Sequence, residues 1–86
     1  MKMSEKDIIH NVLQMTPTFI LAMPRCPFCT KAIAALPSAK VYDYLEYPEL
    51  DSAITDVYSY KTYPKIFLEG EFIGGYSDLV SRNSAL

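Results

Sequence analysis

The order of predicted helices and strands indicates an α/β fold: a four-stranded mixed sheet with helices packed on both faces. Two observations lead to this. A strand, a helix and a second strand follow one another in the first half of the chain, which predicts a right-handed unit with parallel strands. A β-hairpin near the end of the chain predicts two further strands that pair antiparallel.

The first predicted helix covers residues 4–14. Ser4 is a suitable N-cap, Glu5 is an acid in the first turn, and apolar residues then recur at helical spacing from Ile8 onward. Pro17 follows as a helix breaker. We expect this helix as an addition at the N-terminal side of the sheet.

The strand–helix–strand unit occupies residues 18–47. An apolar run at 19–22 is typical of a buried strand, and the segment after the cysteines is rich in helix formers until Pro37. Residues 40–47 are rich in β-forming side chains and predict the second strand over that whole length.

The last elements are an amphipathic helix, a hairpin and a short helix. Acids early and apolar residues later predict a helix over 48–60. Residues 65–68 and 72–73 predict two strands with Gly70 in the turn between them. Ser77 is a candidate N-cap for the final helix.

Length and composition predict one domain over residues 1–86. Half of the residues are apolar, which suffices for a small core. The chain contains neither a long apolar run of about 18 residues nor a signal-peptide pattern, so we expect no membrane association. A net charge of −2 predicts no nucleic-acid partner. We also expect a monomer in the reducing cytoplasm, because both cysteines stand in one Cys-x-x-Cys pair.

This pair, Cys26 and Cys29, is the strongest functional signal. A disulfide closing so small a loop stabilises little, so it is better suited to being broken and remade. Cys26 precedes Pro27 at a predicted strand-to-helix turn, where unpaired N–H groups and the helix dipole favour a thiolate. We therefore predict that Cys26 attacks and that Cys29, one turn into the helix and less exposed, resolves the mixed disulfide.

Two other interpretations of the pair have less support. A zinc site needs more ligands than the chain offers, since only His10 and carboxylates are available beyond the two thiols. Two structural core cysteines would not need a neighbouring Pro27 and Arg25 at a loop.

Charge is unevenly distributed along the chain. Between Lys40 and Lys61 every charged residue is acidic, whereas basic residues stand near the chemical motifs. These basic residues are Arg25, Lys31, Lys61 and Lys65. The pattern either is a random solvated surface or favours a small anionic substrate.

Three motifs in order resemble the glutaredoxins. They are Cys26-Pro27-Phe28-Cys29 after a strand, Thr62-Tyr63-Pro64 before the hairpin, and Gly74-Gly75-Tyr76-Ser77-Asp78-Leu79 after it. The resemblance covers residues 18–86 and is to the dithiol type. It implies a thioredoxin-like fold with a glutathione-dependent oxidoreductase active in cell redox homeostasis and electron transport.

The resemblance implies a glutathione site beside Cys26. Tyr63 would offer its backbone to glutathione next to a cis bond at Pro64, and Thr62 belongs to the same segment. Ser77 with nearby N–H groups would hold the carboxylate of the γ-glutamyl end and Asp78 its ammonium. Phe28 stands where the family usually has tyrosine.

The chain departs from the family pattern at Met23, where many glutaredoxins have a lysine that helps hold the glycine carboxylate of glutathione. Lys61 is the first candidate to supply this charge and Arg25 the second. Since an exposed ion pair is worth at most about 1 kcal/mol, we expect modestly weaker binding.

The reaction implied is thiol–disulfide exchange with glutathione as co-substrate and no tightly bound cofactor. The partners would be glutathionylated or disulfide-containing proteins. Three alternatives remain: a thioredoxin-like protein driven by a reductase, an electron donor to one dedicated partner, and a glutaredoxin that binds a [2Fe–2S] cluster. Members of the last kind usually have a small residue after the first cysteine, which Pro27 is not.

Overall fold

The structure is a computed structural model that describes residues 3–84. It contains four helices and four strands within these residues. They are α1 (Glu5–Met15), β1 (Phe19–Ala22), α2 (Pro27–Ala35), β2 (Lys40–Asp43), α3 (Pro48–Tyr58), β3 (Lys65–Leu68), β4 (Glu71–Gly74) and α4 (Tyr76–Ser84).

The strands form one mixed sheet in the order β2-β1-β3-β4. β1 and β2 pair in parallel, with Phe19 opposite Lys40. β1 pairs antiparallel with β3, and β3 pairs antiparallel with β4. The predicted fold class is therefore confirmed, including the parallel strand–helix–strand unit and the antiparallel hairpin.

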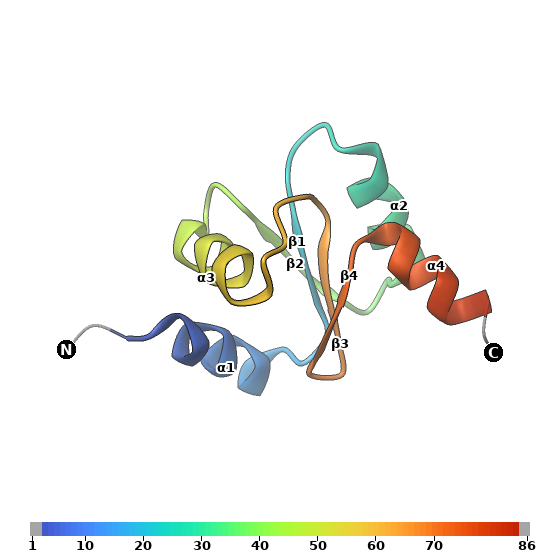
Figure 1. The fold of residues 1–86 in the computed structure, drawn as a ribbon. Helices are drawn as coiled ribbons and strands as arrows, with labels where there is room; N and C mark the ends of the chain where they lie inside the picture. The colour runs from blue at the N-terminus through green and yellow to red at the C-terminus, as the bar shows by residue number, and fades with distance from the viewer. Residues whose placement is uncertain (1–2, 85–86) are drawn as a thin grey trace.

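The helices cover the two faces of the sheet in pairs, with α1 and α3 on one side and α2 and α4 on the other (Figure 1). Each side has its own core. Phe19, Leu21 and Phe67 are buried with α1 and α3. Ile20 and Ile66, which alternate with them along the strands, are buried with α2 and α4. This alternation is the expected consequence of successive side chains pointing to opposite faces.

The start of α1 agrees with the prediction, because the Ser4 hydroxyl accepts a hydrogen bond from the Asp7 N–H at 3.2 Å. Two other boundaries were predicted wrongly. β2 ends at Asp43 instead of residue 47, since the Asp43 carboxylate accepts the Leu45 N–H at 2.7 Å and turns the chain. α3 ends two residues early because Ser59 adopts a left-handed conformation, with φ 52°.

The hairpin turn is at Glu69 and Gly70, with φ 49° and 88°, as expected for a tight turn between antiparallel strands. The start of α4 differs from the prediction. The helix begins at Tyr76, so Ser77 lies in its first turn and does not cap it. The Asp78 carboxylate, in the first turn, accepts the N–H of Gly75 just before the helix at 2.8 Å, as the acid of a capping box does.

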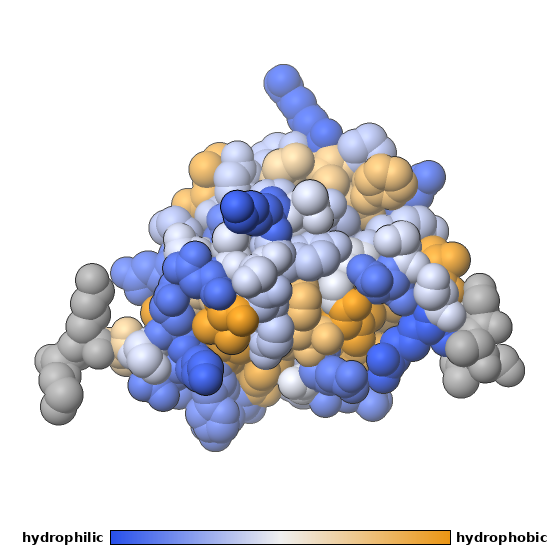
Figure 2. All heavy atoms as spheres, in the orientation of Figure 1, coloured by the Kyte–Doolittle hydropathy of each residue, from blue (hydrophilic) through white to orange (hydrophobic). Residues whose placement is uncertain are grey.

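The surface in Figure 2 is hydrophilic over most of the view, and apolar residues show as separate patches between polar ones. In the part of the chain that the structure describes, no helix has the length and apolar character needed to cross a membrane.

Candidate active site

Cys26 is the N-cap of α2 and is followed by Pro27 at the first helical position. The Cys29 backbone N–H donates to Cys26 Sγ at 3.2 Å. A thiolate at this sulfur thus receives a hydrogen bond from the helix N-terminus, together with the positive end of the helix dipole. The local sequence therefore places the thiol where its reactive form is stabilised.

Cys29 lies one turn further into α2 and is only 2% exposed, whereas Cys26 is 7% exposed. Both thiols are free. Burial, reinforced by the hydrogen bond with Cys26, raises the pKa of the Cys29 thiol to about 12. Cys29 is therefore protonated at neutral pH, as suits a thiol that reacts second.

A groove of about 710 Å³ opens beside Cys26. Its walls come from the loop before α2, the segment before β3 and the start of α4, so residues far apart in sequence share one site. The predicted site residues that line it are Arg25, Cys26, Phe28, Lys61, Thr62, Tyr63 and Ser77.

Tyr63 and Pro64 form the side of the groove next to the thiol. The Tyr63–Pro64 peptide bond is cis, and the Tyr63 carbonyl oxygen lies 3.9 Å from Cys26 Sγ. Pro64 is buried and does not line the groove. The Tyr63 backbone, and not its ring, is thus the part closest to the reactive sulfur.

Ser77 and Asp78 have different surroundings although they are neighbours. Ser77 is exposed and lines the groove. Asp78 does not line it, and one of its carboxylate oxygens accepts the Gly75 N–H. A Cβ at Gly74 would displace this carboxylate, and the φ of 107° at this position favours glycine.

The four basic residues that the sequence grouped together have separate positions. Arg25 and Lys61 are exposed on the groove. Lys31 lies over the rings of Phe28 and Tyr76, at 5.4 and 6.0 Å from their centroids. The sequence interpretation of Lys65 as part of the basic surface is wrong. It is fully buried on the α1 and α3 face because it begins β3 opposite Leu21.

The sequence did not single out several residues that line the groove, among them Tyr60, Gly75 and Tyr76. Gly75 and Tyr76 could have been found, since both lie inside the third motif. Gly75 has a packing reason that no local pattern shows: a Cβ there would clash with the Tyr60 hydroxyl. Tyr60 itself follows α3 with no local signal of its own.

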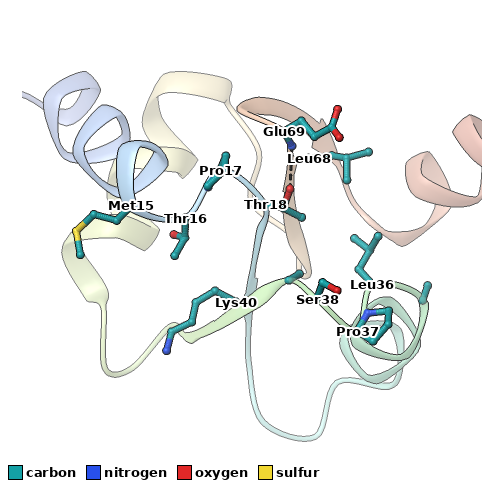
Figure 3. A pocket seen from close by; sticks show the side chains of 12 residues that line it. Met15, Thr16, Pro17, Thr18, Leu36, Pro37, Ser38, Lys40, Leu68 and Glu69 are labelled. Carbon is teal, nitrogen blue, oxygen red and sulfur yellow. Dashed lines mark hydrogen bonds between the residues drawn. The ribbon is translucent and has the colours of Figure 1, made fainter.

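A second groove, of about 530 Å³, lies at the opposite end of the sheet (Figure 3). It includes Thr16 and Leu36, the C-caps of α1 and α2, and Thr18, whose hydroxyl accepts the Glu69 N–H at 3.0 Å. Neither cysteine lines it.

A thiol at the start of a helix, a second thiol one turn on and a mixed four-stranded sheet define a redox protein with the thioredoxin fold. The glutaredoxin family profile matches residues 12–73, well over half of the sequence, and the chain belongs to the glutaredoxin family. The match ends before the Gly74–Asp78 segment.

Two curated relatives support this membership. Monothiol glutaredoxin-S15 of Arabidopsis thaliana, a mitochondrial protein, is 35% identical over an alignment of 86 positions that covers 90% of this chain and 50% of the relative. Glutaredoxin-1 of Rhizophagus irregularis is 32% identical over an alignment of 83 positions that covers 88% of this chain and 82% of the relative. The chain thus spans about half the length of the first relative.

Solved structures agree on the fold. A wheat glutaredoxin superposes with a TM-score of 0.81 at 22% identity, covering 93% of this chain and 82% of that one. A buckwheat glutaredoxin in complex with glutathione superposes with a TM-score of 0.78 at 14% identity, covering 94% and 83%.

Proposed function

We propose that this glutaredoxin reduces protein–glutathione mixed disulfides and protein disulfides with glutathione as co-substrate. The observation that carries the proposal is the groove itself, in which the Cys26 thiol, the Tyr63 backbone and the exposed Ser77 face one space. Glutathione is an extended, anionic peptide, and Arg25 and Lys61 on the groove suit its carboxylates. The structural neighbour from buckwheat binds glutathione.

The first reaction uses one thiol. The Cys26 thiolate attacks the glutathione sulfur of a mixed disulfide, the S–S bond breaks, and the protein thiolate leaves and takes up a proton. Cys26 is then bonded to glutathione. A second glutathione, as thiolate, attacks this glutathione sulfur, which gives glutathione disulfide and restores the Cys26 thiolate. The match to a relative named monothiol agrees with a route that needs a single cysteine.

The second reaction uses both thiols and makes the chain a dithiol glutaredoxin. Cys26 attacks a protein disulfide, and Cys29 then attacks Cys26 Sγ to release the reduced protein. Because Cys29 is buried and protonated at neutral pH, it must lose a proton in this step. Two glutathione molecules finally reduce the internal disulfide and leave as glutathione disulfide.

In this proposal the remaining predicted residues have the following roles. Ser77 and the N–H groups at the start of α4 would receive the γ-glutamyl carboxylate, and Asp78 its ammonium. Thr62 and Phe28 would contact the peptide from opposite walls. Lys61 would replace the charge that Met23 does not provide. A monomer acting in the cytoplasm is part of the same proposal.

The test is reduction of a glutathionylated peptide, coupled to glutathione reductase, by the parent chain and its Cys26→Ser and Cys29→Ser variants. We expect Cys26→Ser to lose at least about a hundredfold in rate and Cys29→Ser to keep most of it. A parent chain that is inactive with glutathione but accepts electrons from thioredoxin reductase would overturn the proposal. Visible absorption of the purified chain separately tests the cluster-binding alternative.

A further inference from the structure

Lys65 is an unusual residue for the core of a small protein. Its side chain is fully buried between two apolar neighbours of the strand, Leu21 across and Phe67 two residues on. Lysine is almost never buried completely unless it is paired. Its Nζ lies 3.2 Å from Asp51 Oδ1, yet within the described residues it makes no hydrogen bond of good geometry.

Stability alone does not explain this ion pair, in which Lys65 is fully buried and the Asp51 side chain is 19% exposed. Removing a lysine ammonium from water costs free energy that the attraction of one carboxylate seldom exceeds, and an apolar side chain of similar size would often be as stable. The pair therefore needs a reason beyond packing, and its third neighbour supplies one.

That neighbour is Tyr63, which contacts both members of the pair. Its hydroxyl lies 2.7 Å from each carboxylate oxygen of Asp51. Lys65 Nζ lies 3.5 Å from the centroid of its ring, a close cation–π contact. Tyr44 packs against the same ring at 5.3 Å. The Tyr63 side chain is thus fixed from the α3 side, from β3 and from the loop after β2. We call the contacts of the Tyr63 side chain with Asp51, Lys65 and Tyr44 the anchor.

The backbone of Tyr63 lies on the side of Cys26. Its carbonyl oxygen lies 3.9 Å from Cys26 Sγ, and the residue lines the groove. Tyr63 accordingly packs against both cores, the one with α1 and α3 and the one with Cys26 and Cys29. Any change in the position of the ring is transmitted to the segment that borders the reactive sulfur.

We propose that Lys65 and Asp51 are positioning residues that act through Tyr63 to hold the groove backbone at a fixed distance from Cys26. The effect on glutathione turnover rests on the function proposed above, whereas the anchoring itself does not. A loosened Tyr63 presents its N–H and C=O to an extended peptide less often in the correct place. The loss should therefore exceed any change in the chemistry of the thiol.

The variants are made in a Cys29→Ser background, in which Cys26 is the sole thiol of the chain. Lys65→Met removes the charge, Tyr63→Phe removes the bond to Asp51 and keeps the ring, and a double variant combines them. Lys40→Met is the matched control, because Lys40 is an exposed strand lysine beside the second groove (Figure 3). Three quantities are measured: amide hydrogen exchange over residues 60–65, kcat and KM for a glutathionylated peptide, and the rate of Cys26 alkylation by iodoacetamide.

We expect Lys65→Met and Tyr63→Phe each to speed exchange at residues 60–65 and to lower kcat/KM about tenfold, mainly through KM. This loss should exceed the loss in alkylation rate by about the same factor. Because the residues act as one unit, the double variant should be no worse than the poorer single variant. Lys40→Met should leave all three quantities as they are.

Unchanged exchange in a folded Lys65→Met chain, or losses that multiply in the double variant, would overturn the proposal. If Lys65→Met does not fold because the Asp51 carboxylate is left unpaired, Tyr63→Phe decides by the same measurements. If the background chain does not turn over the glutathionylated peptide, the proposed function fails. The exchange data then still decide whether the anchor exists.

Discussion

The two ends of the sheet differ in chemistry although each has a groove. At one end, α2 begins at Cys26, and its free N–H groups and positive dipole end meet the thiol. At the other end, α1 and α2 finish at Thr16 and Leu36, where carbonyl groups dominate. The same fold thus offers an anion-stabilising end and an anion-disfavouring end, and Cys26 lines the groove at the first.

The largest difference between the two ends should be in the rate at which a buried and an exposed thiol react with iodoacetamide. Cys29 in a Cys26→Ser chain should react with iodoacetamide at neutral pH at least about a hundredfold more slowly than a cysteine placed at the exposed Ser38, in the second groove of a chain lacking both native cysteines. The reason is that burial raises the pKa of Cys29 well above 9.0, so little thiolate exists. Equal rates would show that Cys29 is accessible.

The raised pKa of Cys29 also makes the free energy of unfolding depend on pH. The unfolded chain releases the Cys29 proton near pH 9.0 and the folded chain near pH 12. The folded state therefore binds the proton more tightly between these values, and stability falls as pH rises from 9 toward 12. Denaturant unfolding of the reduced chain should show this loss. A Cys29→Ser chain should lose less stability over the same pH range, and the loss that remains includes the contribution of Tyr63, whose pKa burial and the Asp51 hydrogen bond also raise.

Two glycines with positive φ, one at each end of the sheet, allow the cost of adding a Cβ to be compared. Gly74, at the Cys26 end, has φ 107° and no room for a Cβ beside Asp78, whereas Gly70 in the hairpin has φ 88° and open space. Gly74→Ala should lower the free energy of unfolding by about 2–4 kcal/mol, and Gly70→Ala by about 1 kcal/mol. Urea unfolding measures both, and a reversed order would contradict the packing described for Gly74.

The start of α2 should have a smaller effect on the alkylation rate of Cys26. With Cys29 replaced by serine, Cys26 should be alkylated at neutral pH about tenfold faster than the cysteine at Ser38, because the Cys29-position N–H and the start of α2 stabilise its thiolate. A rate below that of the Ser38→Cys chain would mean that the partial burial of Cys26 outweighs the helix N-terminus.

Surface charge should have the smallest effect. Lys61→Gln should raise KM for a glutathionylated peptide about two- to fivefold, an effect that added salt reduces, since an exposed ion pair is worth up to about 1 kcal/mol. Lys40→Gln at the other end should leave KM unchanged. A salt-independent effect of Lys61→Gln would indicate a packing role in the groove.

Much of the fold was predictable because local rules and tertiary packing agree. The apolar run at Phe19–Ala22 lies in the centre of the sheet, and the turn at Gly70 has the backbone that its neighbours require. The prediction failed where a local interaction competed with propensity. Residues 44–47 have strand-forming side chains, yet the Asp43 carboxylate turns the chain there.

The sequence by itself determined the position of the two cysteines at the start of a helix, because the Cys-x-x-Cys spacing, Pro27 and the helix that follows are neighbours along the chain. Only the tertiary structure decided which distant residues surround it. Lys65 stands among basic residues in sequence, but its strand position turns it into the core beneath Tyr63. Its partner Asp51 comes from α3, and no local pattern links the two. The physical reason is that helix and turn signals act over a few residues, whereas burial and ion pairing depend on how the faces of the sheet are covered.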